Sequence, residues 1–211
     1  MIPTMINAAL PVIIEVAEHT GFNRYNLRFG KKTLSTRSYT TLEVGEEYYA
    51  NIGTQSGGVI GINTLTPRPK GAYLQGGASL LEELLANGDA NEFRAKIKAA
   101  LADTKDANEF RAYSQMLLAL GEGVISVPFF YENRYALAQF KFENALKGEF
   151  YLLLGSFAPL LARFEDGAIT RVATPYESFS KPLGEALGCE WAVAKIAPLW
   201  SEKKNFLDFE G

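Results

Sequence analysis

One seven-residue string defines much of the middle of this chain. The sequence Asp-Ala-Asn-Glu-Phe-Arg-Ala occurs at residues 89–95 and again at residues 106–112. In each copy an aspartate precedes a glutamate, Glu92 or Glu109, by three positions, which is the spacing of a helix-capping box. Each copy therefore predicts the first turn of a helix. A stacked-repeat architecture is not favoured, because the flanking residues diverge and such folds normally need three or more units.

Further start and stop signals surround the two copies. Ser79 and Glu82 have the spacing of a third capping box, and Gly88 and Gly121 are suitable helix ends. The expected helices are 80–87, 90–103 and 107–120. Three helices joined by such short links are expected to pack closely against one another.

The apolar stretch from Met5 to Ala17 is expected to be neither a signal peptide nor a membrane span. No lysine or arginine precedes it, Glu15 interrupts it, and it is shorter than the roughly 20 residues that cross a bilayer. Pro11 suits a first helical turn and Gly21 a helix end, so we expect a short packing helix here.

Alternating polarity predicts strands on both sides of the helical middle. Between Asn23 and Asn63 the pattern has period two, and Gly30-Lys31 can turn one strand into the next. The expected strands there are 24–29, 32–38, 46–52 and 59–63. Residues 64–70, with two prolines, are expected to be an extended connector.

Strands resume after the helices. They are expected at 124–130, 135–142, 150–154, 160–164, 168–172 and 189–196. Asp166-Gly167 is a two-residue hairpin signal. Thr174 and Glu177 form another capping box, for a helix that Pro182 should kink or end early. Apolar residues in the tail, Trp200, Phe206 and Phe209, predict that it docks on the protein.

The chain is therefore expected to be an α+β protein in which two β-rich segments, each a small sheet or partial barrel, flank a three-helix middle. Residues 1–70 would be β-rich with a leading helix, residues 71–122 helical, and residues 123–211 β-rich with one helix. With 47% hydrophobic residues among 211, the chain can bury a sizeable core.

The overall charge and the cysteine content restrict the kinds of partner and the cellular compartment that we expect. A formal net charge of -3 gives no global attraction to nucleic acids or anionic membranes. The single cysteine, Cys189, excludes an intramolecular disulfide and suits a reducing compartment, so a cytoplasmic location is expected.

Few residues could carry chemistry. The segment Gly53-Thr-Gln-Ser-Gly-Gly58 resembles the serine region of a protease, but the only imidazole, His19, is too near in sequence for that mechanism. A structural turn is the simpler interpretation, and no phosphate-binding loop is present. One histidine and one cysteine cannot supply a zinc site. We therefore expect no catalytic, cofactor-binding or metal-binding residue.

A basic run is the strongest candidate for an interaction site. Its residues are Arg24, Arg28, Lys31, Lys32 and Arg37, and no acidic residue occurs between Thr20 and Leu42. On a sheet these side chains form a solvated face or bind an acidic protein surface. Nucleic-acid binding needs aromatic side chains on the same face, whereas Tyr25 and Phe29 fall on the other.

Two stretches resemble flagellar hook-length control proteins and small related flagellar accessory proteins. They are Asn26-Leu-Arg-Phe-Gly-Lys-Lys-Thr-Leu with Leu42-Glu-Val-Gly-Glu, and residues 150–161 running through the hairpin into the helix at Thr174. The resemblance implies a short β module before a C-terminal domain of paired strands, a helix and a last strand. It also implies contact with the flagellar export machinery and no cofactor. The long ruler segment rich in proline and glutamine is missing, which favours an accessory or chaperone-like protein.

We expect a non-enzymatic bacterial protein that binds a protein partner, with the helical middle and the exposed strand edges as docking surfaces. A nucleic-acid partner and a membrane span are not expected. One alternative is a small-ligand-binding or enzymatic protein with an aromatic pocket. That pocket would be lined by Tyr48, Tyr49, Phe129, Phe130 and Tyr131. A second alternative is nucleic-acid binding through the basic hairpin at residues 24–37.

Overall fold

The computed structural model describes residues 12–54, 60–68, 70–131, 134–154 and 159–202. The chain divides into two compact units, each of which is described by itself. The first unit comprises residues 1–70, 156–158 and 172–195, and the second comprises residues 71–155, 159–171 and 196–211. The expected α+β class is confirmed, with two sheets flanking a helical middle segment.

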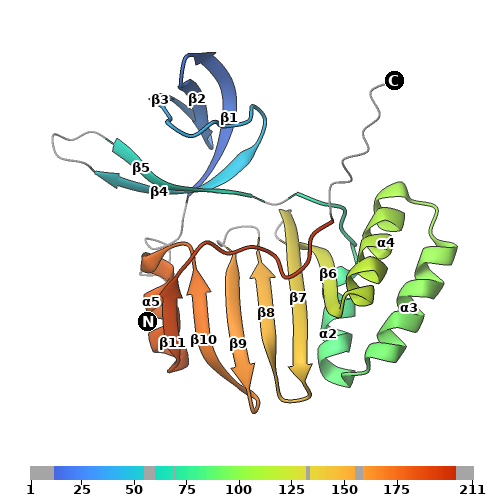
Figure 1. Ribbon diagram of the computed structural model, residues 1–211. Coiled ribbons are helices and arrows are strands. Elements are labelled where there is room, and N and C mark those ends of the chain that lie inside the picture. Colours follow the sequence, from blue (N-terminus) through green and yellow to red (C-terminus); the bar gives the residue numbers. More distant parts are fainter. Residues whose placement is uncertain (1–11, 55–59, 69, 132–133, 155–158, 203–211) are drawn as a thin grey trace. The chain divides into compact units, whose positions relative to one another are not determined.

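An antiparallel sheet of five strands forms most of the first unit. Its order is β3-β2-β1-β4-β5, so β1 is central while β3 and β5 are the edges (Figure 1). The bounds are β1 Val12–Gly21, β2 Arg24–Phe29, β3 Lys32–Arg37, β4 Glu47–Thr54 and β5 Ile60–Pro67. The strands expected between residues 24 and 63 are confirmed, but β5 continues through Pro67 and so includes part of the expected connector at residues 64–70. Residues 55–59 of the glycine-rich segment lie outside the described residues.

Strand β1 lies where a helix was expected, and that prediction is wrong. Ile14 and Val16 are fully buried, whereas Glu15 between them is partly exposed, so burial alternates with period two. β-Branched side chains fit such a half-buried strand well. The first residues of β1, from Val12 to Glu15, pair with β4, and the rest, from Glu15 to Gly21, pair with β2. The first part of the expected helix, up to Pro11, lies outside the described residues.

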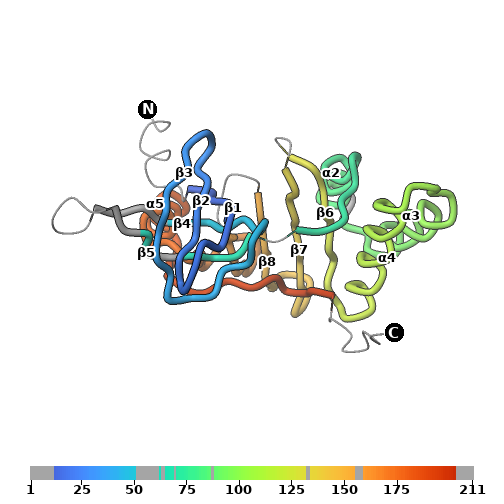
Figure 2. The backbone as a smooth tube through the Cα atoms, turned by 90° about the horizontal axis from the view of Figure 1, so that it is seen from above, coloured from blue at the N-terminus to red at the C-terminus, as the bar shows by residue number. Residues whose placement is uncertain are grey.

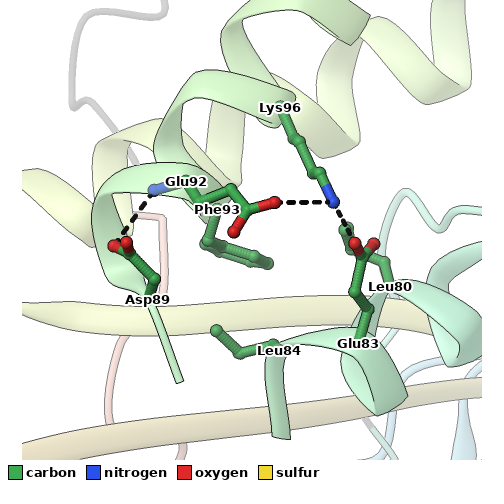
Figure 3. Close-up of a pocket in the computed structure, with 7 residues that line it drawn as sticks. All are labelled: Leu80, Glu83, Leu84, Asp89, Glu92, Phe93 and Lys96. Carbon is green, nitrogen blue, oxygen red and sulfur yellow. Dashed lines mark hydrogen bonds and ion pairs between the residues drawn. The ribbon is translucent and has the colours of Figure 1, made fainter. Parts of the chain in front are cut away.

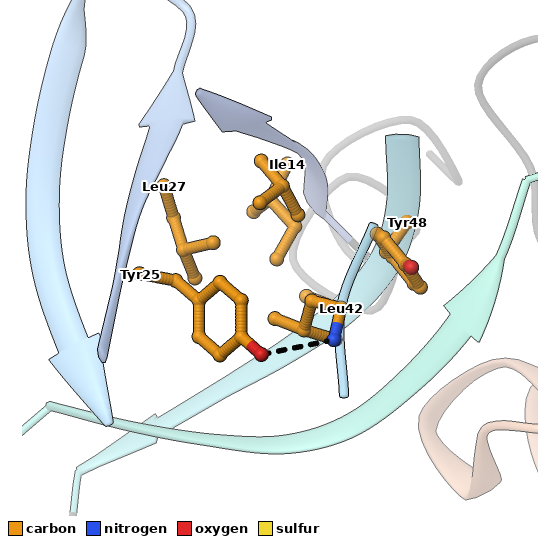
Figure 4. Close-up of a cluster of buried hydrophobic side chains, with 7 residues drawn as sticks. Ile14, Tyr25, Leu27, Leu42 and Tyr48 are labelled. Carbon is orange, nitrogen blue, oxygen red and sulfur yellow. Dashed lines mark hydrogen bonds between the residues drawn. The ribbon is translucent and has the colours of Figure 1, made fainter. Parts of the chain in front are cut away.

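The core of the first unit lies on one face of this sheet. Figure 4 shows Ile14, Tyr25, Leu27, Leu42 and Tyr48 converging there. Leu42 comes from the link between β3 and β4, and its backbone N–H donates to the Tyr25 hydroxyl at 3.4 Å. Burial of one leucine side chain stabilises the fold by about 1.5–3 kcal/mol, so Leu27 and Leu42 anchor the sheet and the link.

The first unit also contains a helix, α5, whose start differs from the prediction. The capping box at Thr174 does not form, because the buried Thr174 hydroxyl accepts from the Tyr176 N–H at 3.2 Å and the helix begins after Tyr176 without a side-chain cap. Pro182 lies inside the helix and does not end it. The Tyr176 hydroxyl donates to the Tyr49 carbonyl at 2.9 Å. The bounds are α5 Glu177–Leu187 and β11 Glu190–Val193.

Three helices of the second unit begin and end largely as expected. Their bounds are α2 Gly77–Asn87, α3 Ala90–Asp103 and α4 Ala107–Gly121. Asp89 caps α3 by accepting from the Asn91 and Glu92 N–H groups at 2.8 and 3.2 Å. Asp106 caps α4 by accepting from the Glu109 N–H at 2.8 Å. Each copy of the repeated string is therefore a helix start, as predicted.

Two of the predicted helix limits are wrong. The box at Ser79 does not form, because α2 begins two residues earlier at Gly77. A Cβ on Gly77 would lie 2.7 Å from the Phe129 Cβ, so this glycine allows the helix start to approach the sheet closely. Gly121 is the last residue of α4 and not its stop. Gly88 does end α2, in the left-handed conformation with φ of 68°.

The second sheet has six strands in the order β11-β10-β9-β8-β7-β6. The remaining bounds are β6 Val124–Tyr131, β7 Arg134–Asn144, β8 Lys147–Leu153, β9 Leu160–Glu165 and β10 Ala168–Thr174. The predicted hairpin at Asp166-Gly167 is confirmed, with φ of 52° and 77° as a two-residue turn of this type requires. Helices α2 and α4 contact β6 (Figures 1 and 2). None of the described helices is long and apolar enough to cross a membrane.

The C-terminal segment docks on this sheet as far as it is described. The buried Gln139 side chain binds both peptide groups of Trp200, donating to its carbonyl at 2.8 Å and accepting from its N–H at 3.1 Å. Glu202 then pairs with Arg111 of α4 at 3.3 Å. The predicted docking is confirmed for Trp200, while Phe206 and Phe209 lie outside the described residues.

Candidate functional site

The predicted basic run forms the hairpin of β2 and β3. Gly30, with φ of 54°, is the first central residue of a two-residue turn, a position that favours glycine. The turn sets the register, so that Phe29 lies opposite Lys32 and Leu27 opposite Leu34. Because side chains alternate between the two faces of a strand, this register determines the face on which each cation lies.

The structure brings three of the five cations to one face. Tyr25 and Leu27 are buried on the core face, so Arg24 and Arg28 lie on the outer face together with Arg37 of β3. Lys32 lies opposite Phe29 and shares the core face, and Lys31 is in the turn. All five cations are exposed.

Arg24 and Arg37 lie directly opposite each other. The next pair along the hairpin is hydrogen-bonded, since the Ser38 N–H donates to the Asn23 carbonyl at 2.9 Å. The arginine pair is therefore a non-hydrogen-bonded one, in which the Cβ atoms lie closest, about 4.5–5.5 Å apart. Like charges in this position destabilise a sheet. Within the described part of the chain, neither arginine forms an ion pair.

The third arginine is compensated. Arg28 lies opposite Glu15 of β1, and its Nη1 lies 3.3 Å from the Glu15 Oε2. Two pairs further along, the Asn26 side chain donates to Glu18 at 2.9 Å. Sequence reasoning missed these acids because they come from a segment that was predicted to be helical. The uncompensated positive charge of the outer face is therefore concentrated at the Arg24–Arg37 end of the hairpin.

Two exposed aromatic residues are near this arginine pair in the chain. Phe22 precedes Asn23 in the β1–β2 turn and Tyr39 follows Ser38 after β3, so both backbones continue from the same hydrogen-bonded pair. Each is 91% exposed, which is unusual for residues of this size. Sequence reasoning missed both, although their positions next to the strand ends were readable. We call Phe22, Arg24, Arg37 and Tyr39 the basic patch.

A small hollow between α2 and α3 has no room for a ligand. It holds about 10 Å³, roughly one water molecule (Figure 3). Lys96 bridges it, forming ion pairs with Glu83 of α2 and with Glu92 of α3. The hydrogen bond that Lys96 donates to the Glu83 carboxylate raises the pKa of Lys96 above its usual range. These groups join the two helices and are not arranged around an empty site.

A larger groove of about 600 Å³ runs between the α2–α3 link and the sheet. Phe142, which is 51% exposed, stacks on Phe140 and meets Phe164 edge to face. Among the described residues that line it, only Asn144 has a polar side chain, and that side chain already accepts from the Leu146 N–H at 2.9 Å. A site for a polar metabolite normally has several converging polar groups, so this groove is not built like one.

The aromatic residues of the alternative pocket do not line either hollow. Tyr48 and Tyr49 belong to the first unit and Phe129, Phe130 and Tyr131 to the second. Tyr49 and Phe129 are core residues, 0% and 4% exposed, and Phe130 stacks on Tyr73.

Titration behaviour does not single out a catalytic group. Burial raises the pKa of Tyr135 to about 12, and burial also raises the pKa of Tyr176. Both hydroxyls are thus harder to ionise, the reverse of what a tyrosine base or nucleophile needs. His19 stacks on Tyr25 with ring centroids 4.7 Å apart. Among the described residues, no three histidine, cysteine, aspartate or glutamate side chains are grouped to hold a metal ion.

The basic patch is therefore the best candidate site: two opposed arginines, exposed and without an acidic partner in the described residues, with two exposed aromatic residues near them in the chain. No protein-family model matches this chain, and no curated protein or solved structure matches it.

Proposed function

We propose that this chain is a non-enzymatic protein-interaction protein, an accessory or chaperone-like factor of flagellar assembly that docks on an acidic partner through the basic patch. The opposed Arg24 and Arg37 carry the proposal. Their repulsion costs stability in the isolated protein, and an acidic partner would turn that cost into attraction.

The composition of the patch supports a protein partner. Arginine, tyrosine and phenylalanine are enriched at protein interfaces, and arginine and tyrosine are frequent hot-spot residues. Phe22 and Tyr39 can bury large areas on binding while losing little side-chain freedom. The two arginines would steer an acidic surface toward the patch and orient it there.

The biological setting is supported by the resemblance to hook-length control proteins. The order of elements fits that resemblance, with the β1–β5 module first and paired strands, α5 and β11 at the C-terminal end. A cytoplasmic location, on the side where export begins, is part of the proposal. The missing ruler segment supports an accessory or chaperone-like role and not a measuring one.

Nucleic-acid binding is the second candidate, and the two exposed aromatic rings favour it, because bases stack on such rings beside arginines. One observation favours a protein partner instead. The aromatic residues of β2 itself, Tyr25 and Phe29, pack against the core and provide no stacking surface.

Capture of partners by two charge variants tests the proposal. The full chain is immobilised as wild type, as Arg24→Glu/Arg37→Glu and as Lys181→Glu, and is exposed to nuclease-treated extract. Lys181 is an exposed cation on α5 and serves as the matched control. We expect one stoichiometric acidic protein on the wild type and on Lys181→Glu, and its loss from the double variant.

Three results would contradict the proposal. The first is equal capture by all three baits, because the patch would then be irrelevant to binding. The second is retention of nucleic acid by the wild type when nuclease is omitted, with loss on the double variant, which would support the second candidate. The third is a large, ligand-specific thermal shift with a small metabolite, which would support a ligand-binding protein.

A further inference from the structure

We propose that β3 receives an extended acidic segment of the partner as an added strand, with acidic and apolar residues alternating along that segment. This inference rests on the proposed function and specifies how the partner binds. It goes beyond charge attraction because it requires a defined backbone pairing on one edge of the first sheet.

The backbone of β3 is arranged for such pairing. Among the described strands, in the order β3-β2-β1-β4-β5, β3 has a neighbour on one side only. The Ser38–Asn23 hydrogen bond sets the phase of the hairpin, so the peptide groups of Lys32, Leu34 and Thr36 point toward β2. Those of Thr33 and Ser35, and of Arg37 at the strand end, consequently point away from β2, to the open edge. An extended segment could pair with this row of donors and acceptors.

The charges around the edge select an acidic occupant. Residues of an added strand opposite Thr33, Ser35 and Arg37 would share the outer face of the hairpin. There they would lie beside Arg37 and within reach of Arg24, which have no acidic partner among the described residues. Acidic side chains at these alternate positions would compensate both arginines.

The other face of the edge selects apolar residues. Leu34 is 42% exposed, although its neighbour across the hairpin, Leu27, is 1% exposed. The core of the first unit thus ends at Leu34 with part of an apolar side chain uncovered. An added residue opposite Leu34 would lie on this face and cover it. The favoured occupant therefore alternates acidic and apolar residues.

A second copy of this chain is a poorer occupant. Pairing of two β3 strands would bring together two hairpins that each carry five cations, of which only Arg28 has an acidic partner in the described residues. Charged residues on an edge normally prevent such self-pairing. Here the same positive charges would attract an acidic strand, so the edge discriminates between partners by the sign of their charge.

Binding of two isomeric peptides to the full chain tests the inference. One probe alternates glutamate and valine; the other has the same composition with its glutamates in one block and its valines in another. We expect the alternating peptide to bind about tenfold more tightly in fluorescence anisotropy, because only it can place acids and valines on opposite faces. Equal binding of both peptides, lost in Arg24→Glu/Arg37→Glu, would overturn strand addition and leave the proposed function standing.

Substitution of Ser35 tests the backbone pairing. The N–H of Ser35 points to the open edge, so Ser35→Pro removes an edge donor without breaking a bond to β2. We expect Ser35→Pro to bind the alternating peptide about tenfold more weakly than the wild type does. The matched Ser35→Ala should bind it with the wild-type affinity. Unchanged binding by a folded Ser35→Pro would overturn the inference.

Amide hydrogen exchange of the wild type gives a second readout that does not depend on a variant folding. With peptide bound, the amides of Thr33 and Ser35 should become protected, whereas those of Leu34 and Thr36, already bonded to β2, should change little. Uniform protection, or none, would overturn strand addition. Concentration-dependent dimerisation abolished by Ser35→Pro would also overturn it, by identifying a second copy as the occupant.

Discussion

Reversing one charge of the arginine pair should stabilise the protein. In Arg37→Glu, repulsion across the hairpin is replaced by attraction to Arg24. Each cross-strand charge interaction contributes about 0.2–1 kcal/mol, so the exchange should raise the free energy of unfolding by about 1 kcal/mol. Little packing is lost, because Arg37 is exposed. For a chain of this length, such a change raises the Tm by about 2–4 °C.

Thermal and urea unfolding at two salt concentrations measure this effect. Arg37→Gln removes the repulsion without adding attraction, so it should give about half of the gain. The gain should shrink between about 0.02 M and about 0.5 M salt, because screening weakens interactions between exposed charges. Arg37→Glu should at the same time lose partner binding. An Arg37→Glu variant that is less stable than the wild type at low salt, or whose gain over the wild type is the same at both salt concentrations, would refute the assignment of Arg24 and Arg37 as a repelling pair.

Three further predictions concern the second unit. Asp89→Ala and Asp106→Ala should each lower the free energy of unfolding by about 1 kcal/mol, measured by urea unfolding, through loss of a helix cap. The raised pKa of Tyr135 should make stability fall from pH 10, the ordinary value, up to about pH 12, and Tyr135→Phe should remove that loss in alkaline unfolding curves. Gly148→Ala should cost about 1–3 kcal/mol by calorimetry, because its Cβ would lie 2.5 Å from the Lys141 carbonyl oxygen.

Local signals in the sequence were sufficient for the elements that depend on neighbouring residues. The side chains of Asp89 and Asp106 cap their helices by accepting from backbone N–H groups three residues further along, so the repeated string predicted both starts. The hairpin at Asp166-Gly167 likewise depends on two residues that accept positive φ. In both cases, the interaction that stabilises the element involves residues that are close together in the sequence.

The predictions that were wrong concern elements whose structure depends on residues distant in the sequence. Proline and glycine at the ends of the N-terminal segment suited a helix, but pairing with β2 and β4 makes residues 12–21 a strand. The alternation of Ile14 and Val16 with Glu15 was the signal for that strand. At Ser79, the approach of α2 to Phe129 moved the helix start to Gly77, and no local pattern carries that information.

The candidate site was found only in part for the same reason. The basic run was visible, and the prediction that Tyr25 faces away from the arginines is confirmed. The opposition of Arg24 and Arg37 depends on register, and the pairing of Arg28 with Glu15 depends on β1 being a strand. Sequence reasoning treated the five cations as equivalent. In the fold, Glu15 compensates the charge of Arg28, while the uncompensated charge of the outer face is concentrated at Arg24 and Arg37.

Photo-crosslinking in living cells tests the central proposal most directly. Benzoylphenylalanine in place of Tyr39, which is 91% exposed, puts a reactive group within the basic patch, and the same residue in place of Tyr131, 44% exposed on the second unit, is the control. We expect one acidic protein to crosslink at Tyr39, not at Tyr131, and to disappear when Arg24→Glu and Arg37→Glu are added. Crosslinks to nucleic acid, or a protein crosslink at Tyr39 that survives both charge reversals, would contradict the proposal that the basic patch binds an acidic protein.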